Sequence, residues 1–399
     1  MNPEFEHLYQ ALSKVDGFIY PNEIELSWSI LIVLYPFITG LVAGAFILAS
    51  LERVFNVKSL RPTYVIALLT SFAFLLVATM PLIFHLGQPL RAWEIMMTPH
   101  LTSAMAIFGF VYLWYLMIVL LLEIWFDYRY DLVLWAREST GVKKWLYKAL
   151  ALGSDDISPK SVKLDQKLGY IVTVIGIPSA FLLHGYVGFI FGSIKANPWW
   201  STVMMPIIFL FSAMVSGIAL VMLLFIIINK VRKQKIDMLC LDTIAKYLFY
   251  IIIIDFTMES LDQIHRFYEA EESFEIIQLL ISGHLNFTLL VMQVGIGMFL
   301  PLTTLGILQF YKPAEKVRQL LYFITGVLVL IGIFFMRWNV VIGGQLFSKS
   351  FYGYTTFKTG LIGMEGYLMA ATWLIIPFLI LSFLLWLLPP WNKIETSHE

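Results

Sequence analysis

Cysteine is almost absent from the 399-residue sequence, which contains Cys240 alone. A single thiol cannot form a disulfide framework, hold an iron–sulfur cluster or complete a zinc site. We therefore expect no iron–sulfur cluster belonging to this chain and no metal-ligating residues. We also expect no catalytic residues, because the sequence indicates no soluble catalytic domain. If electrons pass through the protein, another subunit or a diffusible carrier must bring them.

Charge is also scarce. Charged residues make up 14% of the sequence and hydrophobic residues 59%, with a mean hydropathy of +0.79, whereas soluble domains carry about 25% charged residues. Basic and acidic residues balance at 27 each, so no basic surface for nucleic acid is indicated. The composition excludes an ordinary soluble enzyme and indicates a protein embedded in a membrane.

Long apolar stretches recur along the chain, and a helix that spans a bilayer needs about 20 such residues. We predict about nine spans, at residues 27–50, 63–86, 101–126, 167–193, 202–229, 241–262, 276–309, 317–340 and 366–388. The seventh is too long for one simple crossing, so we expect it to tilt or to begin as a surface segment. The sequence thus predicts an all-α polytopic membrane protein.

Basic residues alternate between the segments that connect these spans. Nineteen Lys and Arg residues fall in one alternate set of connections and six in the other, and cytoplasmic loops carry the excess. We therefore predict the N-terminus outside and the C-terminus inside. Residues 1–26 and 341–365 are then periplasmic, 127–166 is the largest cytoplasmic loop, and 366–399 holds the ninth helix and a cytoplasmic tail.

Titratable side chains within spans are costly, which makes each of them a candidate for function. The sixth span carries a row on one helix face that consists of Asp255, Glu259, Asp262 and Arg266. Nearly all buried polar groups are expected in the outer half of the bilayer, and those near the inner interface are Glu123 and Lys246. This one-sided pattern favours a pocket that opens outward over a continuous ion pathway. The alternative is a row that merely stabilises helix contacts.

Histidines allow a test for haem, which needs two facing ligands at similar depth. His184 and His284 are expected at similar depth, so a pair stays open. However, no predicted span carries two histidines at the spacing of a two-haem wire. We expect no haem in this chain, and the alternative role for each histidine is hydrogen-bonded packing.

Several stretches carry a resemblance to a known family. They are WSILIVLYPFITGLVAG in the first span, HLGQPLRAWEIMMTPHLTSAMAIFG after the second, HGYVGFIFGSIKANPWW at the end of the fourth and RWNVVIGGQ at the end of the eighth. In order and spacing, over about residues 27–388, the chain resembles the NrfD/PsrC family, the membrane subunits of polysulfide reductase and related respiratory complexes. This implies two four-helix bundles, 27–193 and 202–340, plus one extra helix.

The resemblance also implies a role. Such subunits exchange electrons between quinone or quinol and a periplasmic ferredoxin-like iron–sulfur subunit, which connects to a catalytic molybdopterin or cytochrome subunit. We expect a diffusible quinone, menaquinone by resemblance, as the substrate, and the prokaryotic cytoplasmic (inner) membrane as the location. The chain would be a subunit of an oxidoreductase complex and not an enzyme alone.

The resemblance places the quinone pocket near the outer end of the first bundle. A quinone carbonyl needs a donor that can also pass a proton, and an imidazole or a phenol can do both. The expected quinone-binding residues are Tyr35, His184, Tyr186, His85 and Arg91. Partner docking is expected at Gln88, Arg91, Trp93 and Arg337, and proton transfer at Asp255 and Glu259.

Two other functions remain open from the sequence. The first is an ion- or proton-translocating membrane protein in which Asp255 and Glu259 form the carrier site. The second is a membrane anchor for a peripheral complex, without a quinone site of its own. Buried charges without a purpose argue against the anchor.

Overall fold

The computed structural model describes residues 16–18, 20, 24–98, 100, 102–269, 274–350 and 352–392. Most of the predicted periplasmic segment 1–26 lies outside these residues, as does the end of the predicted cytoplasmic tail, 393–399.

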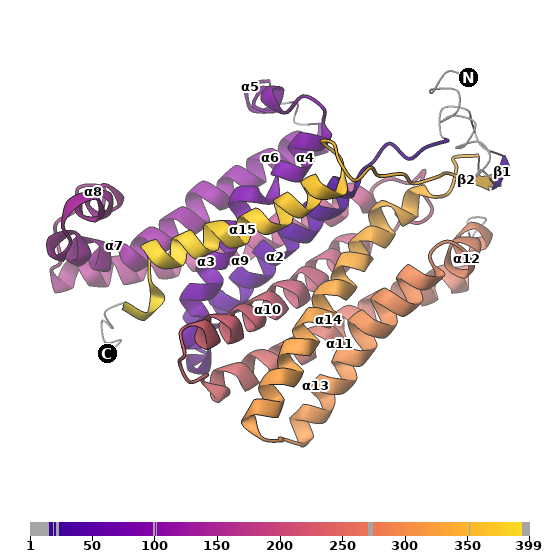
Figure 1. Cartoon of the computed structure of the whole chain (residues 1–399). Coiled ribbons are helices and arrows are strands. Elements are labelled where there is room, and N and C mark those ends of the chain that lie inside the picture. The colour runs from indigo at the N-terminus through magenta and orange to yellow at the C-terminus, as the bar shows by residue number, and fades with distance from the viewer. Residues whose placement is uncertain are drawn as a thin grey trace.

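Helices form nearly all of the described fold (Figure 1). The α-helices are α2 (Ile30–Arg53), α3 (Arg61–Ala78), α4 (Met80–His85), α5 (Glu94–Met97), α6 (Ala104–Trp114), α7 (Leu121–Glu138), α8 (Gly141–Leu150), α9 (Pro159–Gly192), α10 (Met205–Val231), α11 (Met238–Glu269), α12 (Phe274–Ser282), α13 (Leu300–Phe310), α14 (Glu315–Val341) and α15 (Tyr367–Leu387). This confirms the predicted all-α fold class.

Shorter elements complete the chain. The 3-10 turns are η2 (Lys58–Leu60), η3 (Pro89–Arg91), η6 (Gly343–Gln345) and η7 (Pro390–Asn392), and the π-helices are η4 (Tyr115–Leu120) and η5 (Asn286–Phe299). Strands β1 (Asp16–Phe18) and β2 (Tyr352–Tyr354) pair antiparallel. Below, the end of the bundle that carries β1 and β2 is called the ribbon end, and the opposite end is called the α8 end (Figure 1).

Within the described residues, eight helical stretches are long and apolar enough to cross a membrane. They are Ile30–Arg53, Lys58–His85, Ala106–Glu138, Pro159–Gly192, Met205–Val231, Asn286–Phe310, Glu315–Gln345 and Tyr367–Asn392. The predicted span 241–262 lies in α11, which is long enough, but every 18-residue stretch of α11 contains at least three charged residues. The polytopic membrane fold is confirmed, while nine crossings and the N-out orientation stay predictions.

The seventh predicted span, 276–309, is divided in the structure. α12 ends at Ser282, and after a turn the π-helix η5 and then α13 continue to Phe310. The extra length therefore belongs to a separate short helix, α12. A π-helix of 14 residues is rare, and π-helical turns occur often at functional sites.

α2 is the central helix, buried along nearly its whole length and packed against α3, α9, α10 and α14. Its closest approach is to α10, where a Cβ atom at Gly44 would lie 2.1 Å from the carbonyl oxygen of Ala213. A Cβ at Gly217 would lie 2.4 Å from the Cα atom of Gly44. Small residues thus bring the two backbones together, as in other membrane helix pairs.

A second close crossing joins η5 to α14. A Cβ atom at Gly297 would lie 2.2 Å from the Cα atom of Gly332. This crossing brings together Gln293, one turn from Gly297, and Asn339, two turns from Gly332, which are joined by a hydrogen bond. Both residues belong to the site described below.

Candidate functional site

His184 of α9 is fully buried, and its ring stacks on Phe209 with centroids 5.7 Å apart. Its Nε2 atom lies 3.0 Å from Nη2 of Arg337, which can only donate, so Nε2 accepts this hydrogen bond. Nδ1 therefore carries the hydrogen and donates to Oγ1 of Thr39 at 3.3 Å. The imidazole is neutral, and both of its nitrogens are engaged.

Arg337 of α14 is the largest fully buried side chain in the described residues. Besides its bond to His184, Nη2 donates to Oγ of Ser212 at 2.6 Å, and the guanidinium lies 4.0 Å from the centroid of the Phe209 ring. We expected Arg337 at the docking surface for a partner. That prediction is wrong, because a side chain with no exposed surface cannot contact a docked protein.

Asp255 and Glu259 of α11 are the acidic groups that act electrostatically on Arg337. Glu259 Oε2 accepts a hydrogen bond from Gln293 at 2.9 Å, and Gln293 Oε1 accepts one from Asn339 at 2.8 Å. Oδ1 of Asp255, Oε1 of Glu259 and Oδ1 of Asn339 are buried without a hydrogen-bond partner among the described residues. Two carboxyl groups and one guanidinium thus share a buried region without a direct ion pair.

Tyr35 of α2 lies one turn before Thr39, whose hydroxyl donates to the Tyr35 carbonyl at 3.0 Å. The Tyr35 side chain is 3% exposed, its hydroxyl has no partner among the described residues, and its ring meets Phe108 edge-on at 5.3 Å. Tyr186 is half-buried and follows His184 by two residues on α9. Of the five predicted quinone-binding residues, the structure brings Tyr35, His184 and Tyr186 into one region.

His85 lies apart from this region, at the end of α4. Its Nδ1 atom is 2.8 Å from Oε1 of Glu365 and 3.3 Å from Oγ of Ser29, the N-cap of α2. His85 therefore ties three segments together at the ribbon end.

The turn that follows, η3 and α5, projects from the bundle at its ribbon end (Figure 1). Arg91 donates to both carboxylate oxygens of Glu94 at 2.8 Å and to Gln88 at 3.2 Å. These bonds hold the pKa of Glu94 below its usual value. Arg91 and Trp93 are well exposed, so Arg91 does not reach the Tyr35 region, and this turn remains a candidate for docking.

A second buried polar cluster lies at the α8 end. Arg53 pairs with Asp127 and donates to the Tyr64 hydroxyl. Glu123 is fully buried and accepts hydrogen bonds from Tyr64 at 3.2 Å and from Thr173 at 2.8 Å. Arg53, Tyr64 and Asp127 also line a cavity of about 960 Å³. The prediction that buried polarity lies almost wholly at one end is therefore wrong.

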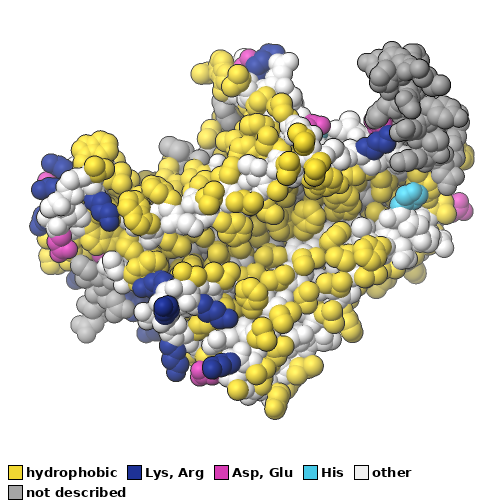
Figure 2. All heavy atoms as spheres, in the orientation of Figure 1, with side chains coloured by type: hydrophobic (Ala, Val, Ile, Leu, Met, Phe, Trp, Pro, Cys, Tyr) yellow, Lys and Arg dark blue, Asp and Glu magenta, His cyan; other side chains and the backbone are white. Residues whose placement is uncertain are grey.

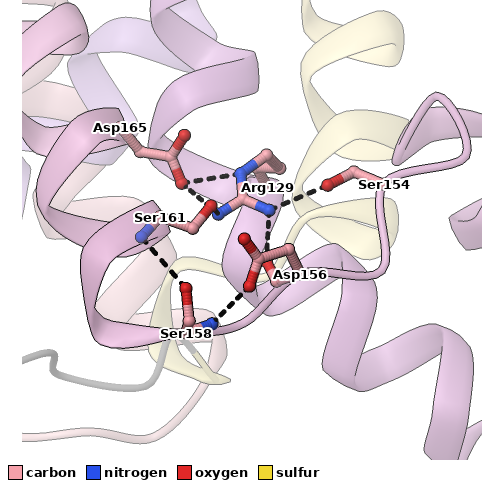
Figure 3. Close-up of polar contacts among 6 residues, drawn as sticks. All are labelled: Arg129, Ser154, Asp156, Ser158, Ser161 and Asp165. Atoms are coloured by element: carbon pink, nitrogen blue, oxygen red, sulfur yellow. Dashed lines mark hydrogen bonds and ion pairs between the residues drawn. The ribbon is translucent and has the colours of Figure 1, made fainter.

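Arg129 of α7 extends this cluster (Figure 3). It donates to Asp165 of α9 at 2.7 Å, to the hydroxyls of Ser154 and Ser161 at 2.9 and 2.6 Å, and to the carbonyl of Asp156 at 2.6 Å. One guanidinium thereby fixes the start of α9 and the segment before it.

Two further predicted polar groups have local roles. His284 is exposed and stacks on Tyr354 at 4.2 Å, so it does not face His184. The Asp262 carboxylate accepts from Arg266 at 2.9 Å, and Arg266 donates to backbone carbonyls between α9 and α10. This pair matches the interpretation that the end of the row stabilises helix contacts.

The sequence did not reveal the uncharged residues that hydrogen-bond to His184, Arg337 and Glu259 or extend those bonds. They are Thr39, Ser212, Gln293 and Asn339. Single hydroxyls and amides are common in apolar helices, so no signal in the sequence alone marks these as facing His184 or Glu259.

Several known proteins are similar to this chain in sequence. A family model described as "Polysulphide reductase, NrfD" matches residues 21–349. A selenate reductase subunit of Mesobacillus selenatarsenatis is 28% identical over 406 residues, which cover 94% of this chain and 88% of the relative. Protein NrfD of Escherichia coli is 29% identical over 50% of this chain and 59% of its own length. The NrfD homolog of Haemophilus influenzae is 24% identical over 81% of this chain and 95% of its own length.

Proposed function

Because the chain belongs to the NrfD family and is a membrane subunit of a respiratory oxidoreductase complex, we propose that it reacts with quinone or quinol from the bilayer. Electrons would pass between that quinone and a periplasmic iron–sulfur subunit, and through it a catalytic subunit. Oxidation of one quinol yields one quinone, two electrons and two protons. The electrons leave to the partner, so this chain must provide groups that bind the headgroup and receive the protons.

The observation that carries the proposal is the buried Tyr35 hydroxyl, which has no hydrogen-bond partner among the described residues. The backbone carbonyl of Tyr35 accepts from Thr39, and the Thr39 hydroxyl contacts His184. A phenol buried in apolar surroundings without a partner is costly. A quinone carbonyl oxygen would accept its hydrogen, and a quinol hydroxyl would donate to its oxygen. The half-buried Tyr186, two residues after His184 on α9, is the second phenol that we assign to the headgroup.

His184 acts in this proposal as a positioning residue. Both ring nitrogens are bonded, so the ring cannot take a quinol proton until Nε2 releases Arg337. After release, Arg337 keeps its bond to Ser212. The imidazole therefore holds Thr39, and through it the Tyr35 turn, and becomes a proton acceptor only after that exchange.

Protons would leave toward α11. Arg337 and Asn339 lie two residues apart on α14, and Asn339 leads through Gln293 to the Glu259 carboxylate. Asp255 and Glu259 each have an oxygen that makes no hydrogen bond within the described protein. These oxygens fit the proposed proton acceptors, and docking of the iron–sulfur partner is assigned to the exposed turn with Gln88, Arg91 and Trp93.

The test is binding of a fluorescent quinol-analogue inhibitor to the full-length chain and to Tyr35→Phe. Loss of one hydrogen bond should weaken binding about fivefold. Tyr115→Phe is the matched control. Tyr115 lies in η4, its hydroxyl is also buried without a partner among the described residues, and its ring packs edge-on against Phe46 of α2. Equal binding by native protein and Tyr35→Phe would contradict the proposal for Tyr35. Saturable binding absent from both the folded chain and the assembled complex would favour a membrane anchor.

Ion or proton translocation is the second candidate function. It is favoured by the two carboxyl groups of α11, which share one guanidinium without a direct ion pair. Quinol turnover that acidifies one side of sealed vesicles beyond the two protons of each quinol would support it.

A further inference from the structure

α8 lies outside the helix bundle, beside α7 (Figure 1). One of its faces is packed: Leu146, Tyr147 and Leu150 contact the core, and the Tyr147 hydroxyl donates to the carbonyl of Leu387 at 3.1 Å. The Tyr147 ring also packs on Trp135 with centroids 5.4 Å apart. This face alone explains why α8 is held against α7 and the end of α15.

A second face of α8 is apolar and has no partner in the described protein. Val142 is 80% exposed and Trp145 70%, and Ala149 is exposed as well. The spacing i, i+3, i+7 places the three on one stripe of the helix. Trp145 is exposed on a face that makes no packing contact within the described protein. An exposed apolar face of this kind indicates that something apolar outside the chain covers it.

Lysines border that stripe. Lys144 and Lys148 are exposed and lie one turn apart on the flank next to Trp145. Lys143, on the packed side, places its Nζ 5.0 Å from the centroid of the Trp386 ring. α8 contains three lysines and no acidic residue, and Figure 2 shows basic and hydrophobic side chains together over it.

The tryptophans near the end of α15 indicate where α8 lies relative to the membrane–water interface. Trp386 and Trp391 are partly exposed at the last turns of the helical stretch Tyr367–Asn392, and tryptophans collect where spanning helices leave the bilayer. Lys143 contacts one of them directly, so α8 lies at the height of that interface.

We propose that α8 is an interfacial helix that binds anionic phospholipid. Val142 and Trp145 enter the acyl-chain region, while Lys144 and Lys148 contact the phosphate-bearing headgroups, with Lys143 holding the helix to α15. An apolar stripe flanked by lysines is the pattern of helices that lie in the plane of an anionic membrane surface. This surface is separate from the quinone region, because α8 is at the other end of the bundle from Tyr35.

The test uses the full-length chain in neutral detergent, with an environment-sensitive dye attached at Val142→Cys in a Cys240→Ser background. Titration with phosphatidylglycerol should shift the dye emission to the blue, and phosphatidylcholine should do so much more weakly. Each lysine near an anionic surface contributes about fivefold in affinity. Lys144→Gln with Lys148→Gln should therefore raise the apparent dissociation constant about 25-fold.

The matched control is Lys233→Gln with Lys235→Gln, which removes the same charge from the exposed turn between α10 and α11 and should leave the titration unchanged. Salt should weaken the response of the native chain, since the lysines are exposed. Equal responses to both lipids, or equal losses in both double variants, would overturn the proposal. So would a blue shift that appears only when a soluble partner protein is added, because the stripe would then be a protein-docking surface.

Discussion

The two buried polar clusters differ in how their charges are compensated. At the α8 end, Arg53 pairs with Asp127 and Arg129 pairs with Asp165. At the ribbon-end side, Arg337 meets a histidine, a serine and a carbonyl, and its nearest acids keep unpartnered oxygens. Removing one member of a paired cluster leaves an isolated buried charge. A cluster without direct ion pairs can gain or lose a proton with less disruption.

This contrast suggests a division of work. The paired cluster holds α2, α7 and α9 together, whereas the unpaired cluster is suited to proton transfer. Glu123 is the exception at the α8 end, since it is buried with neutral hydrogen-bond partners and one unpartnered oxygen. The following variants would break or sharpen the comparison.

The largest effect on stability is expected at Arg129. Arg129→Ala removes the partner of the buried Asp165 carboxylate and the donor to the segment before α9. We expect a loss of about 3–5 kcal/mol in unfolding free energy, measured by thermal unfolding in detergent. Arg137→Ala is the control, because Arg137 is exposed and donates to one carbonyl, and it should cost under about 0.5 kcal/mol. Similar losses in both variants would show that the paired cluster is not the structural one.

Arg337 should behave in the opposite way. Arg337→Gln keeps a donor for His184 and Ser212 but removes the buried positive charge. We expect the fold to survive and quinol turnover by the assembled complex to fall about a hundredfold, as when other preorganised charges are removed. The assay is quinol oxidation in membranes, with thermal unfolding in parallel. Full turnover would remove Arg337 from the proposed proton route.

A smaller effect is expected when single carboxyl groups are neutralised. Glu259→Gln keeps a hydrogen-bond acceptor for Gln293 but cannot take a proton, so turnover should fall about tenfold, or about 1.4 kcal/mol in barrier height. Glu123→Gln is the matched variant at the α8 end and should leave turnover within about twofold. If the Glu123 variant loses more activity than the Glu259 variant, the proposed division between the two clusters is reversed.

Sequence reasoning succeeded where the signal extends over a whole segment. The polytopic membrane fold, the all-α class and the family resemblance rest on long stretches and on their order along the chain, and each is confirmed by the structure or by the family match. The predicted span 241–262 is not among the eight candidate spans of the described residues. It also placed Tyr35, His184 and Tyr186 near one another. The quinone role of these residues stays a proposal.

Reasoning from sequence failed where the direction of one side chain mattered. Arg337 was placed correctly near the end of a helix, but it points inward to His184 on a helix 153 residues away in sequence. The spanning helices are apolar on all sides, so the helical period does not reveal which face is buried. The cluster around Glu123 was missed for the same reason, because Arg53, Tyr64 and Asp127 come from three different helices.

The sequence by itself determined that this chain is a bundle of membrane helices, since hydrophobicity is a property of residues and of short segments. The tertiary structure decided which buried charges are paired, which tautomer His184 adopts and which face of α8 is left uncovered. Those properties depend on partners that close glycine crossings such as Gly44–Gly217 bring together. Helix packing sets such contacts, and the order of residues along one helix does not.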